Sequence, residues 1–387
     1  MERMKCVRTV LISSLLLSAA VAQTPEPTQP AQPAQPAASA QTPAPEAPPA
    51  PKSMLGPIDL SGQLDVYADF NFDHPASGLN QLRNFDMKGN QFSLNMAKIT
   101  LSHDPNPVGF RLDLGAGRAF DTMHLTEPAP RGFRFVEQMY VSLKPAKAKG
   151  LEVDFGQFVT SAGAEVFETK DNWNYSRSLL FAWAIPYYHF GLRATMPLGK
   201  YFTGGVQVVN GWNNLVDNNT GKTVGITGAL AVGKVTWSQN YYVGPEKTDT
   251  NTGLRQLFDT TVLVNATKTT SFYLNYDYGM DKKILGGSNR WVGIAGAARF
   301  QLTKVFAVAP RLEWFNDADG FSTGTVQKVK EATITGEFKI REGVLTRLEY
   351  RRDWSNAPFF DRGATPGTYK NQDTLLAGLV LYFSAKK

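Results

Sequence analysis

The feature that most constrains this chain is a strict alternation of apolar and polar residues that recurs along its length. Between Ile58 and Asp73, for example, the apolar residues Leu64 and Val66 flank Asp65. The same alternation returns at residues 108–115, 188–196, 272–278, 291–300 and 347–351. Successive side chains of a β-strand point to opposite faces, so each segment has one apolar face and one water-compatible face. We therefore expect an all-β fold.

Strand length separates a membrane barrel from a soluble sandwich, in which strands alternate as well. The alternating segments run for roughly 10–14 residues, whereas strands of soluble proteins have about 5–6. A tilted strand needs about 9–11 residues to cross a bilayer. The lengths therefore favour a membrane-spanning barrel.

The connections between these segments alternate between short and long. We place short turns near residues 104–107, 145–150, 197–200, 233–234, 267–270, 303–304 and 341–343. We place longer polar loops near residues 74–90, 120–132, 159–186, 213–222, 244–256, 280–290, 316–328 and 354–371. Short turns on one side and long loops on the other are typical of outer-membrane barrels. We predict a transmembrane antiparallel up-and-down β-barrel of about sixteen strands, with both chain ends on the short-turn side.

Two strands break the alternation. Residues 92–103 change phase near Ala97, and Glu137 falls on the otherwise apolar face of its strand. An extra residue in one strand of a pair reverses the side-chain phase, so we expect a bulge at Glu137.

Aromatic residues cluster near the predicted strand ends, where barrels carry interfacial aromatic girdles. The expected girdle residues are Tyr67, Phe70, Tyr187, Tyr188, Tyr241, Tyr242, Tyr278, Trp314, Phe315, Tyr350, Tyr382 and Phe383.

The N-terminal segments are not expected to join the barrel. Residues 1–22 have a basic start, a short apolar core and the small-residue end Ala20-Val21-Ala22, which is typical of a cleaved signal peptide. The only cysteine, Cys6, lies here, so no disulfide is expected in the mature chain. Residues 23–53 hold ten of the 23 prolines and predict a disordered periplasmic linker. The barrel is then residues 54–387, with a modest and scattered net charge of +5, and we expect no nucleic-acid partner.

Motifs for catalysis and metal binding are missing from the sequence. The four histidines have no metal-ligand spacing, and neither H-E-x-x-H nor G-x-S-x-G occurs. The glycine pairs near residues 115 and 286 do not lie between a strand and a helix, so neither predicts a phosphate site. We expect no enzyme activity, no cofactor and no metal.

The chain resembles known barrels in two places. Residues 376–383 resemble the C-terminal assembly signal of outer-membrane barrels, carried here by Gly378, Leu381 and Phe383, although four residues follow the aromatic. The resemblance implies recognition by the barrel-assembly machinery. The body, from about Leu60 to Phe383, resembles the β-barrel porin family described as OmpL-like. That resemblance is clearest at Gly156-Gln157-Phe158, Gly163, Glu165, residues 174–178, Pro186, His189 and Gly191.

The resemblance to porins implies a functional role for the longest loop, residues 159–186. In sixteen-stranded porins the third long loop folds into the lumen and narrows it, and this loop has the same ordinal place. The pore-constriction candidates are Glu165, Glu168, Lys170, Asp171 and Arg177. Strand phase predicts further charged residues on the lumen wall, because charge on a lipid face is costly. These lumen-wall candidates are Arg111, Asp113, Arg193, Arg299, Arg311, Glu313, Arg347, Glu349 and Arg351.

The resemblance implies an outer-membrane porin through which small hydrophilic solutes diffuse passively past an inserted loop. Two alternatives stay open: a channel that prefers sugars or small acids, with stacking surfaces such as Trp173, Trp183 and Trp212, or a non-conducting structural or adhesive barrel. The expected partners are outer-membrane lipid, the barrel-assembly machinery and the solutes. The sequence also leaves a homo-oligomer open.

Overall fold

The computed structural model describes residues 56–127 and 131–385, so the predicted signal peptide and linker lie outside the described residues. The barrel strands are β1 (Asp59–Asn71), β2 (Gln91–His103), β3 (Val108–Ala116), β4 (Val136–Leu143), β5 (Glu152–Val159), β6 (Tyr188–Pro197), β7 (Phe202–Val209), β8 (Thr223–Val232), β9 (Val235–Lys247), β10 (Thr250–Val264), β11 (Thr270–Lys282), β12 (Ser288–Gln301), β13 (Phe306–Asp317), β14 (Gln327–Arg341), β15 (Val344–Ser355) and β18 (Asn371–Ala385). A separate hairpin joins β16 (Phe360–Arg362) to β17 (Thr365–Tyr369). The short helices are α1 (Arg118–Met123), α2 (Leu179–Trp183), η1 (Arg131–Phe135) and η2 (Thr169–Asp171).

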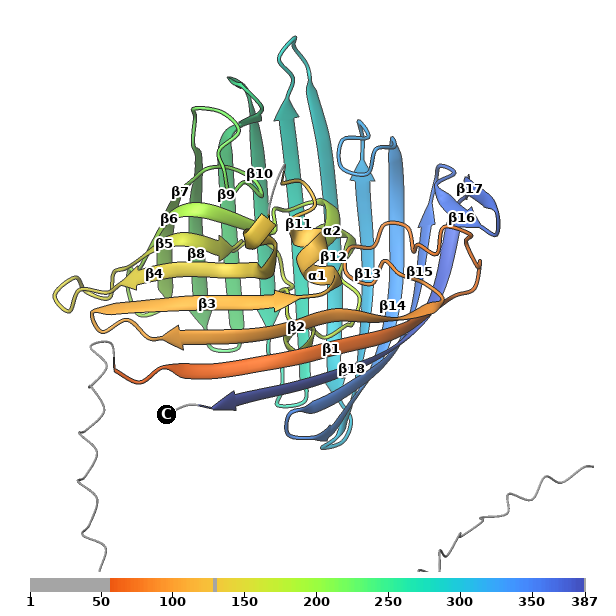
Figure 1. The fold of residues 1–387 in the computed structure, drawn as a ribbon, viewed down its shortest axis with the longest axis horizontal. Helices are drawn as coiled ribbons and strands as arrows, with labels where there is room; N and C mark the ends of the chain where they lie inside the picture. The colour runs from red at the N-terminus through yellow and green to blue at the C-terminus, as the bar shows by residue number, and fades with distance from the viewer. Residues whose placement is uncertain (1–55, 128–130, 386–387) are drawn as a thin grey trace, which may run out of the picture. The chain divides into compact units, whose positions relative to one another are not determined.

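These sixteen strands form one closed antiparallel barrel, as the alternation predicted. The barrel closes between its first and last strands, where Leu60 pairs with Ala385 and Asn71 pairs with Thr374. The two ends of the barrel therefore lie side by side at the edge that carries the short turns, which confirms the predicted placement (Figure 1). None of the helices in the described part of the chain is long and apolar enough to cross a membrane.

The alternation in the sequence becomes an outward and an inward face. On β1, Leu64 and Phe70 are exposed on the outer wall, while Asp65 and Asp69 are buried inside. Outward apolar side chains suit a lipid environment, because they avoid the cost of placing polar groups in hydrocarbon. The inward face is polar, and that face positions the functional site.

Both predicted irregularities are present. In the β1–β2 pair, Asp65 faces Met96 and Val66 faces Leu94, so Asn95 is the extra residue. The phase change is thus two residues from the predicted position. In the β3–β4 pair, Asp113 faces Gln138 and Leu114 faces Val136, so Glu137 is the extra residue. This bulge turns Glu137 into the barrel, where its side chain is buried.

Two of the predicted long loops are wrong. Residues 244–256 belong mostly to β9 and β10, which leave only residues 248 and 249 between them. Residues 280–290 shorten to a connection of residues 283–287. Where a strand extends beyond the membrane, its polar residues form the same backbone hydrogen bonds with the neighbouring strand as apolar residues do. Polarity alone therefore does not distinguish such a strand from a loop.

The aromatic girdle is only partly as expected. The outward set includes the exposed residues Phe70, Tyr241, Tyr278, Tyr350 and Phe383. The residues Tyr67, Tyr188, Tyr242 and Phe315 are instead buried on the inside of the barrel, and Tyr187 lies in the loop after β5. The prediction that these inward rings belong to the girdle is wrong, because large rings also pack against the loops that enter the barrel.

Candidate lumen site

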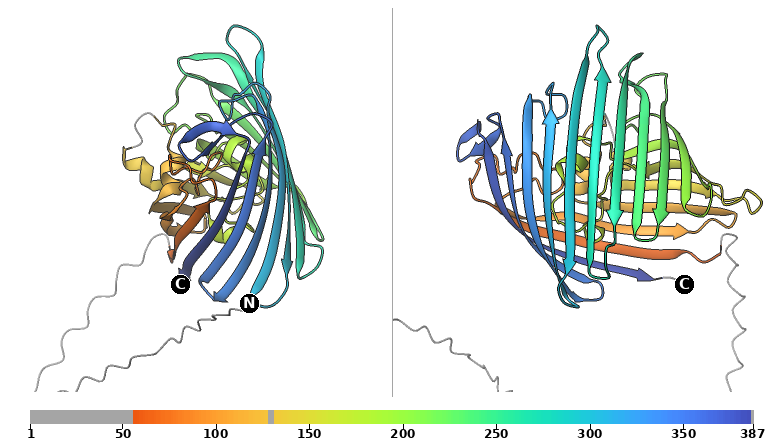
Figure 2. Two further views of the ribbon diagram at one scale, coloured as in Figure 1. Left: turned by 90° about the vertical axis from the view of Figure 1, so that its right-hand side faces the viewer. Right: turned by 180° about the vertical axis from the view of Figure 1, so that it is seen from behind.

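The longest loop, residues 160–187 between β5 and β6, folds into the barrel; we call it L3. Its helix α2 is enclosed by the barrel strands in the views of Figures 1 and 2. The sequence favours this helix locally, since the Ser178 side chain caps its first turn by accepting a hydrogen bond from the Phe181 backbone N–H at 3.0 Å. The helix presents Leu179, Leu180 and Phe181 as a buried apolar surface.

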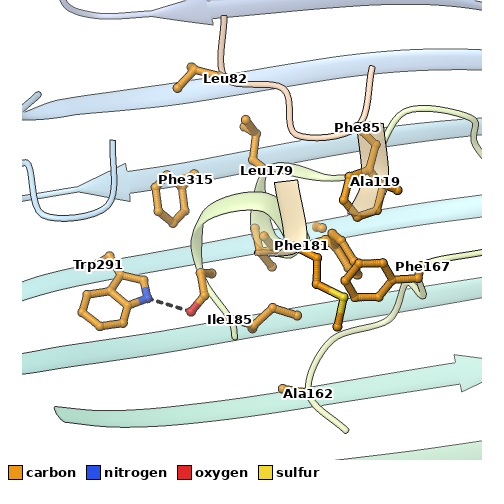
Figure 3. Packing of buried hydrophobic residues seen from close by; sticks show 14 of the residues in the cluster. Leu82, Phe85, Ala119, Ala162, Phe167, Leu179, Phe181, Ile185, Trp291 and Phe315 are labelled. Atoms are coloured by element: carbon orange, nitrogen blue, oxygen red, sulfur yellow. Dashed lines mark hydrogen bonds between the residues drawn. The ribbon is translucent and has the colours of Figure 1, made fainter. Parts of the chain in front are cut away.

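An apolar cluster holds L3 inside the barrel (Figure 3). Phe167 and Phe181 from L3 pack on Phe85 from the β1–β2 loop, with ring centroids 5.1 and 5.7 Å away. The indole Nε1 of Trp291 on β12 donates a hydrogen bond to the Ala184 carbonyl at 3.0 Å, which is the dashed line in Figure 3. Each fully buried Phe or Leu stabilises such a cluster by roughly 1.5–3 kcal/mol. L3 is therefore anchored as a packed element.

Carboxylates of the barrel wall accept hydrogen bonds from the backbone of L3. Glu349 on β15 accepts from the Tyr175 N–H at 2.6 Å and from the Ser176 N–H at 2.9 Å. Glu313 on β13 accepts from the Leu179 N–H at 2.8 Å, at the start of α2. A buried N–H without a partner costs free energy, so these carboxylates allow this irregular chain to be buried.

Arginines of the same wall donate to the carbonyls of L3. Arg311 donates to the Ser176 carbonyl at 2.7 Å, Arg351 to the Arg177 carbonyl at 2.6 Å and Arg347 to the Asn174 carbonyl at 3.2 Å. Arg311 also bonds Glu165 of L3 at 2.7 Å. All three arginines are buried. The wall charges on β13–β15 therefore position L3.

Tyr175 fixes the middle of L3 against the seam where the barrel closes. Its hydroxyl donates to Asp65 Oδ1 on β1 at 2.6 Å. Its ring lies over Gly378 on β18, where an added Cβ would come within 2.4 Å of the ring. Gly378 therefore has a packing role in addition to its expected place in the assembly signal. Leu381 and Phe383, the other residues of that signal, are exposed on the outer wall.

Two hollows lie on opposite sides of L3. The inner hollow, about 430 Å³, is on the short-turn side and is lined by Lys98, Arg111, Glu168, Lys170 and Asp171 among others. The outer hollow, about 470 Å³, is on the long-loop side and is lined by Asn84, Trp183, Trp212, Arg255 and Phe321 among others. The packed body of L3, including the buried Arg177, lies between them.

Lys98 organises the charges beside the inner hollow. Within the described residues, three carboxylates come within 4.8 Å of one another, those of Asp113, Glu137 and Glu168. The Lys98 ammonium lies 2.9 Å from Glu137 and 3.6 Å from Asp113, and it also bonds Glu168. The cluster therefore already holds a cation, its own lysine.

The charge state of Glu168 follows from this arrangement. Burial favours a raised pKa, but the adjacent Lys98 ammonium outweighs burial and holds the pKa of Glu168 below its usual value. Glu168 is outside the spanning strands, in L3. It therefore stays ionised at neutral pH and keeps a negative charge at the edge of the inner hollow.

The constriction candidates fall into two groups. Glu168, Lys170 and Asp171 line the inner hollow. Glu165 and Arg177 are buried within L3: Glu165 accepts from the Ser178 N–H at 2.6 Å, and Arg177 donates to the Val166 and Tyr175 carbonyls at 2.9 and 2.6 Å. The second group shapes the loop and does not border either hollow.

The remaining wall candidates pair within the wall. Arg111 bonds Asp113 at 3.0 Å and lines the inner hollow. Arg193 bonds Asp154 at 2.7 Å across the β5–β6 pair, and Arg299 bonds Glu337 at 2.7 Å. Each of these three arginines is therefore balanced by a carboxylate of the wall itself.

Sequence reasoning missed the inward folding of two other loops. Arg83 and Phe85 of the β1–β2 loop are buried, as are Phe120 and Met123 of α1 in the β3–β4 loop, and the three apolar residues join the cluster around L3. The only signal was the presence of large apolar residues in segments that are polar on the whole. Lys98 and Glu137 were also not singled out as site residues.

The comparisons with known proteins agree with this architecture. No curated protein matches the sequence. The fold is similar to that of OmpT from Vibrio cholerae, with TM-score 0.57 and 11% identity over 86% of this chain and 99% of that chain. It is similar to an anion-selective porin from Comamonas acidovorans, with TM-score 0.56 and 12% identity over 84% and 99%. It is also similar to the outer membrane channel DcaP of Acinetobacter baumannii, with TM-score 0.58 and 11% identity over 86% and 99%.

The family is shown by the sequence match. The family model described as "Putative beta-barrel porin-2, OmpL-like" matches residues 57–383, which is nearly the whole described barrel. Over these residues the structure is a closed sixteen-strand antiparallel barrel, which agrees with a β-barrel family. This chain belongs to that family of outer-membrane β-barrel porins.

Proposed function

We propose that small hydrophilic solutes diffuse passively through this porin along a path that L3 narrows. The observation that carries the proposal is the position of L3, which lies inside the barrel between two hollows of about 430 and 470 Å³ with polar side chains in their walls. Polar and charged groups along such a path replace part of the hydration of a solute, while the width of the path sets the size limit. The side chains act by shape and charge, because a porin is a channel and not an enzyme.

The charged residues then have two roles. Glu168, Lys170, Asp171 and Arg111 face the inner hollow and act on a passing solute directly. A buried second set holds L3 in place and acts indirectly. This set comprises Glu165, Arg177, Arg311, Glu313, Arg347, Glu349 and Arg351.

The proposed partners follow from the outer surface. The exposed apolar residues of the outer wall suit outer-membrane lipid, and the outward Leu381 and Phe383 suit recognition of β18 by the barrel-assembly machinery. One of the similar solved structures is titled as a trimer form of OmpT, and a homo-oligomer of this chain is proposed on that likeness alone.

Liposome swelling tests the proposed function. We expect liposomes that contain the refolded protein to swell in isotonic arabinose, and to swell more slowly in sucrose and more slowly again in a tetrasaccharide. The competing account is a non-conducting barrel, since L3 fills the middle of the lumen. An absence of swelling in arabinose, from protein shown to be folded by its β-type circular dichroism, would favour that account. Liposomes without protein provide the baseline.

A further inference from the structure

The outer hollow combines ring surfaces with unpaired hydrogen-bond donors. It is bordered by L3 through Trp183, by the β7–β8 loop through Trp212 and Asn214, by the β1–β2 loop through Asn84 and by the β13–β14 loop through Phe321. Its volume of about 470 Å³ is within the roughly 300–1,000 Å³ of pockets that hold small molecules. The site lies on the route of any solute that approaches L3 from the long-loop side.

The aromatic rings around the hollow are held in fixed positions. Trp291 stacks on Phe321 with ring centroids 5.2 Å apart, and it meets Trp212 edge-on at 6.0 Å. Gly279 makes room for Trp291, because a Cβ at that position would lie 1.8 Å from the indole. Trp183 donates through Nε1 to the Leu82 carbonyl at 3.1 Å. Since Trp183 and Trp212 are only half-buried, they present ring surface to the hollow.

The side-chain amide nitrogens of two asparagines at the hollow have no acceptor in the described part of the chain. The Nδ2 atoms of Asn84 and Asn214 are buried without a hydrogen-bond acceptor among the described residues. Asn84 is 3% exposed. A buried donor that lacks an acceptor costs free energy. Rotation of either amide toward the hollow would bring its Nδ2 to an acceptor oxygen of a ligand, which would relieve that cost.

Both arginines that line the hollow are already paired with carboxylates. Arg255 bonds Asp281 at 3.0 Å while its guanidinium lies 5.2 Å from the Trp212 ring centroid. Arg83 bonds Asp353 at 3.1 Å and also bonds Asp86. No carboxylate is among the described residues that line the hollow. These features favour a neutral ligand over an ionic one.

We propose that the outer hollow is a binding site for a neutral saccharide. A saccharide offers hydroxyl and ring oxygens to the amides of Asn84 and Asn214, and its apolar C–H faces can lie on the rings of Trp183 and Trp212. This inference rests on the proposed porin function, because the bound saccharide is then a solute held before it passes L3. It names the solute class for which the channel has a preference.

Current block by maltotriose tests the proposal, with polyethylene glycol of the same hydrodynamic size as the comparison. We expect maltotriose to reduce the ion current of the refolded protein saturably, and the glycol to have no saturable effect. Trp212→Ala should weaken the block about tenfold, as loss of one ring contact. Trp173→Ala is the matched control, since Trp173 packs on Tyr273 and does not line the hollow. Asn84→Leu should also weaken the block.

The outcomes separate this inference from the proposed function. Steady ion current without block by maltotriose would overturn the saccharide site and leave the porin function standing. Equal block by the glycol, or equal loss in the two tryptophan variants, would also overturn it. Absence of current from folded protein would overturn the porin function. Quenching of tryptophan fluorescence by maltotriose, measured in detergent, would then decide whether the site exists.

Discussion

Replacement of residues 161–186 by Asn-Gly should raise the single-channel conductance severalfold. L3 fills the middle of the lumen, and the width of the path limits the current, so its removal widens the narrowest section. The replacement is compatible with the barrel, because the Thr160 N–H already bonds the Tyr187 carbonyl at 3.0 Å and Val159 pairs with Tyr188. A two-residue Asn-Gly turn closes such a pair. Planar-bilayer recording measures the effect.

A second shortened loop provides the control. The Lys283 N–H donates to the Gly287 carbonyl at 3.0 Å across the β11–β12 connection, so residues 284–286 can be replaced by the same Asn-Gly turn. Ile284 and Leu285 are exposed, and this connection does not border either hollow. We expect the conductance of this control variant to match that of the unaltered chain. An unchanged conductance in the L3 variant, from folded protein, would contradict the placement of the narrow section at L3.

Arg311→Ala should destabilise the barrel by about 3–5 kcal/mol, the usual cost of leaving buried charge without its partner. Arg311 is fully buried and lies 2.7 Å from Glu165, 3.0 Å from Glu313 and 3.3 Å from Glu331. Its loss leaves three carboxylates facing one another and removes the bond to the Ser176 carbonyl. The measurement is denaturant unfolding in micelles, followed by tryptophan fluorescence.

Arg352→Ala is the control for this substitution. Arg352 pairs with Asp373 at 3.1 Å, but its side chain is 47% exposed, so we expect a loss below about 1 kcal/mol. If repulsion among carboxylates causes the instability of the Arg311 variant, Glu331→Gln added to Arg311→Met should recover part of it. Equal stabilities for the Arg311 and Arg352 variants would show that the buried network does not hold L3. Arg311→Lys keeps the positive charge, and it replaces the alanine variant in the unfolding measurement if that variant fails to fold.

The barrel could be predicted from the sequence because its determinants are local. Period-two alternation and the rhythm of turns depend only on neighbouring residues, and they predicted the sixteen strands and the side of the barrel on which its two ends lie. The bulge at Glu137 was predictable for the same reason, because a charged residue on an apolar face marks a local change of phase. The inward orientation of Arg311, Arg347 and Arg351 also followed from strand phase.

The interior could not be predicted in the same way, because it depends on contacts between distant segments. Phe85 meets Phe167 only after the β1–β2 loop and L3 have both entered the barrel. Because Arg177 is charged, it was expected at the water-filled constriction, yet it is buried and donates hydrogen bonds to carbonyls of its own loop. The outer hollow joins residues of several separate loops. The periodicity of the sequence does not indicate such contacts between distant segments.

Single-channel recording of the refolded mature protein under a salt gradient tests the central claim most directly, namely that the barrel is an open porin with L3 at its narrow section. The account predicts discrete current steps of one stable size. The reversal potential would then show whether the ionised Glu168 or the cations Lys98, Arg111 and Lys170 dominate the inner hollow. An absence of steps from demonstrably folded protein would contradict the account and would mean that L3 closes the barrel.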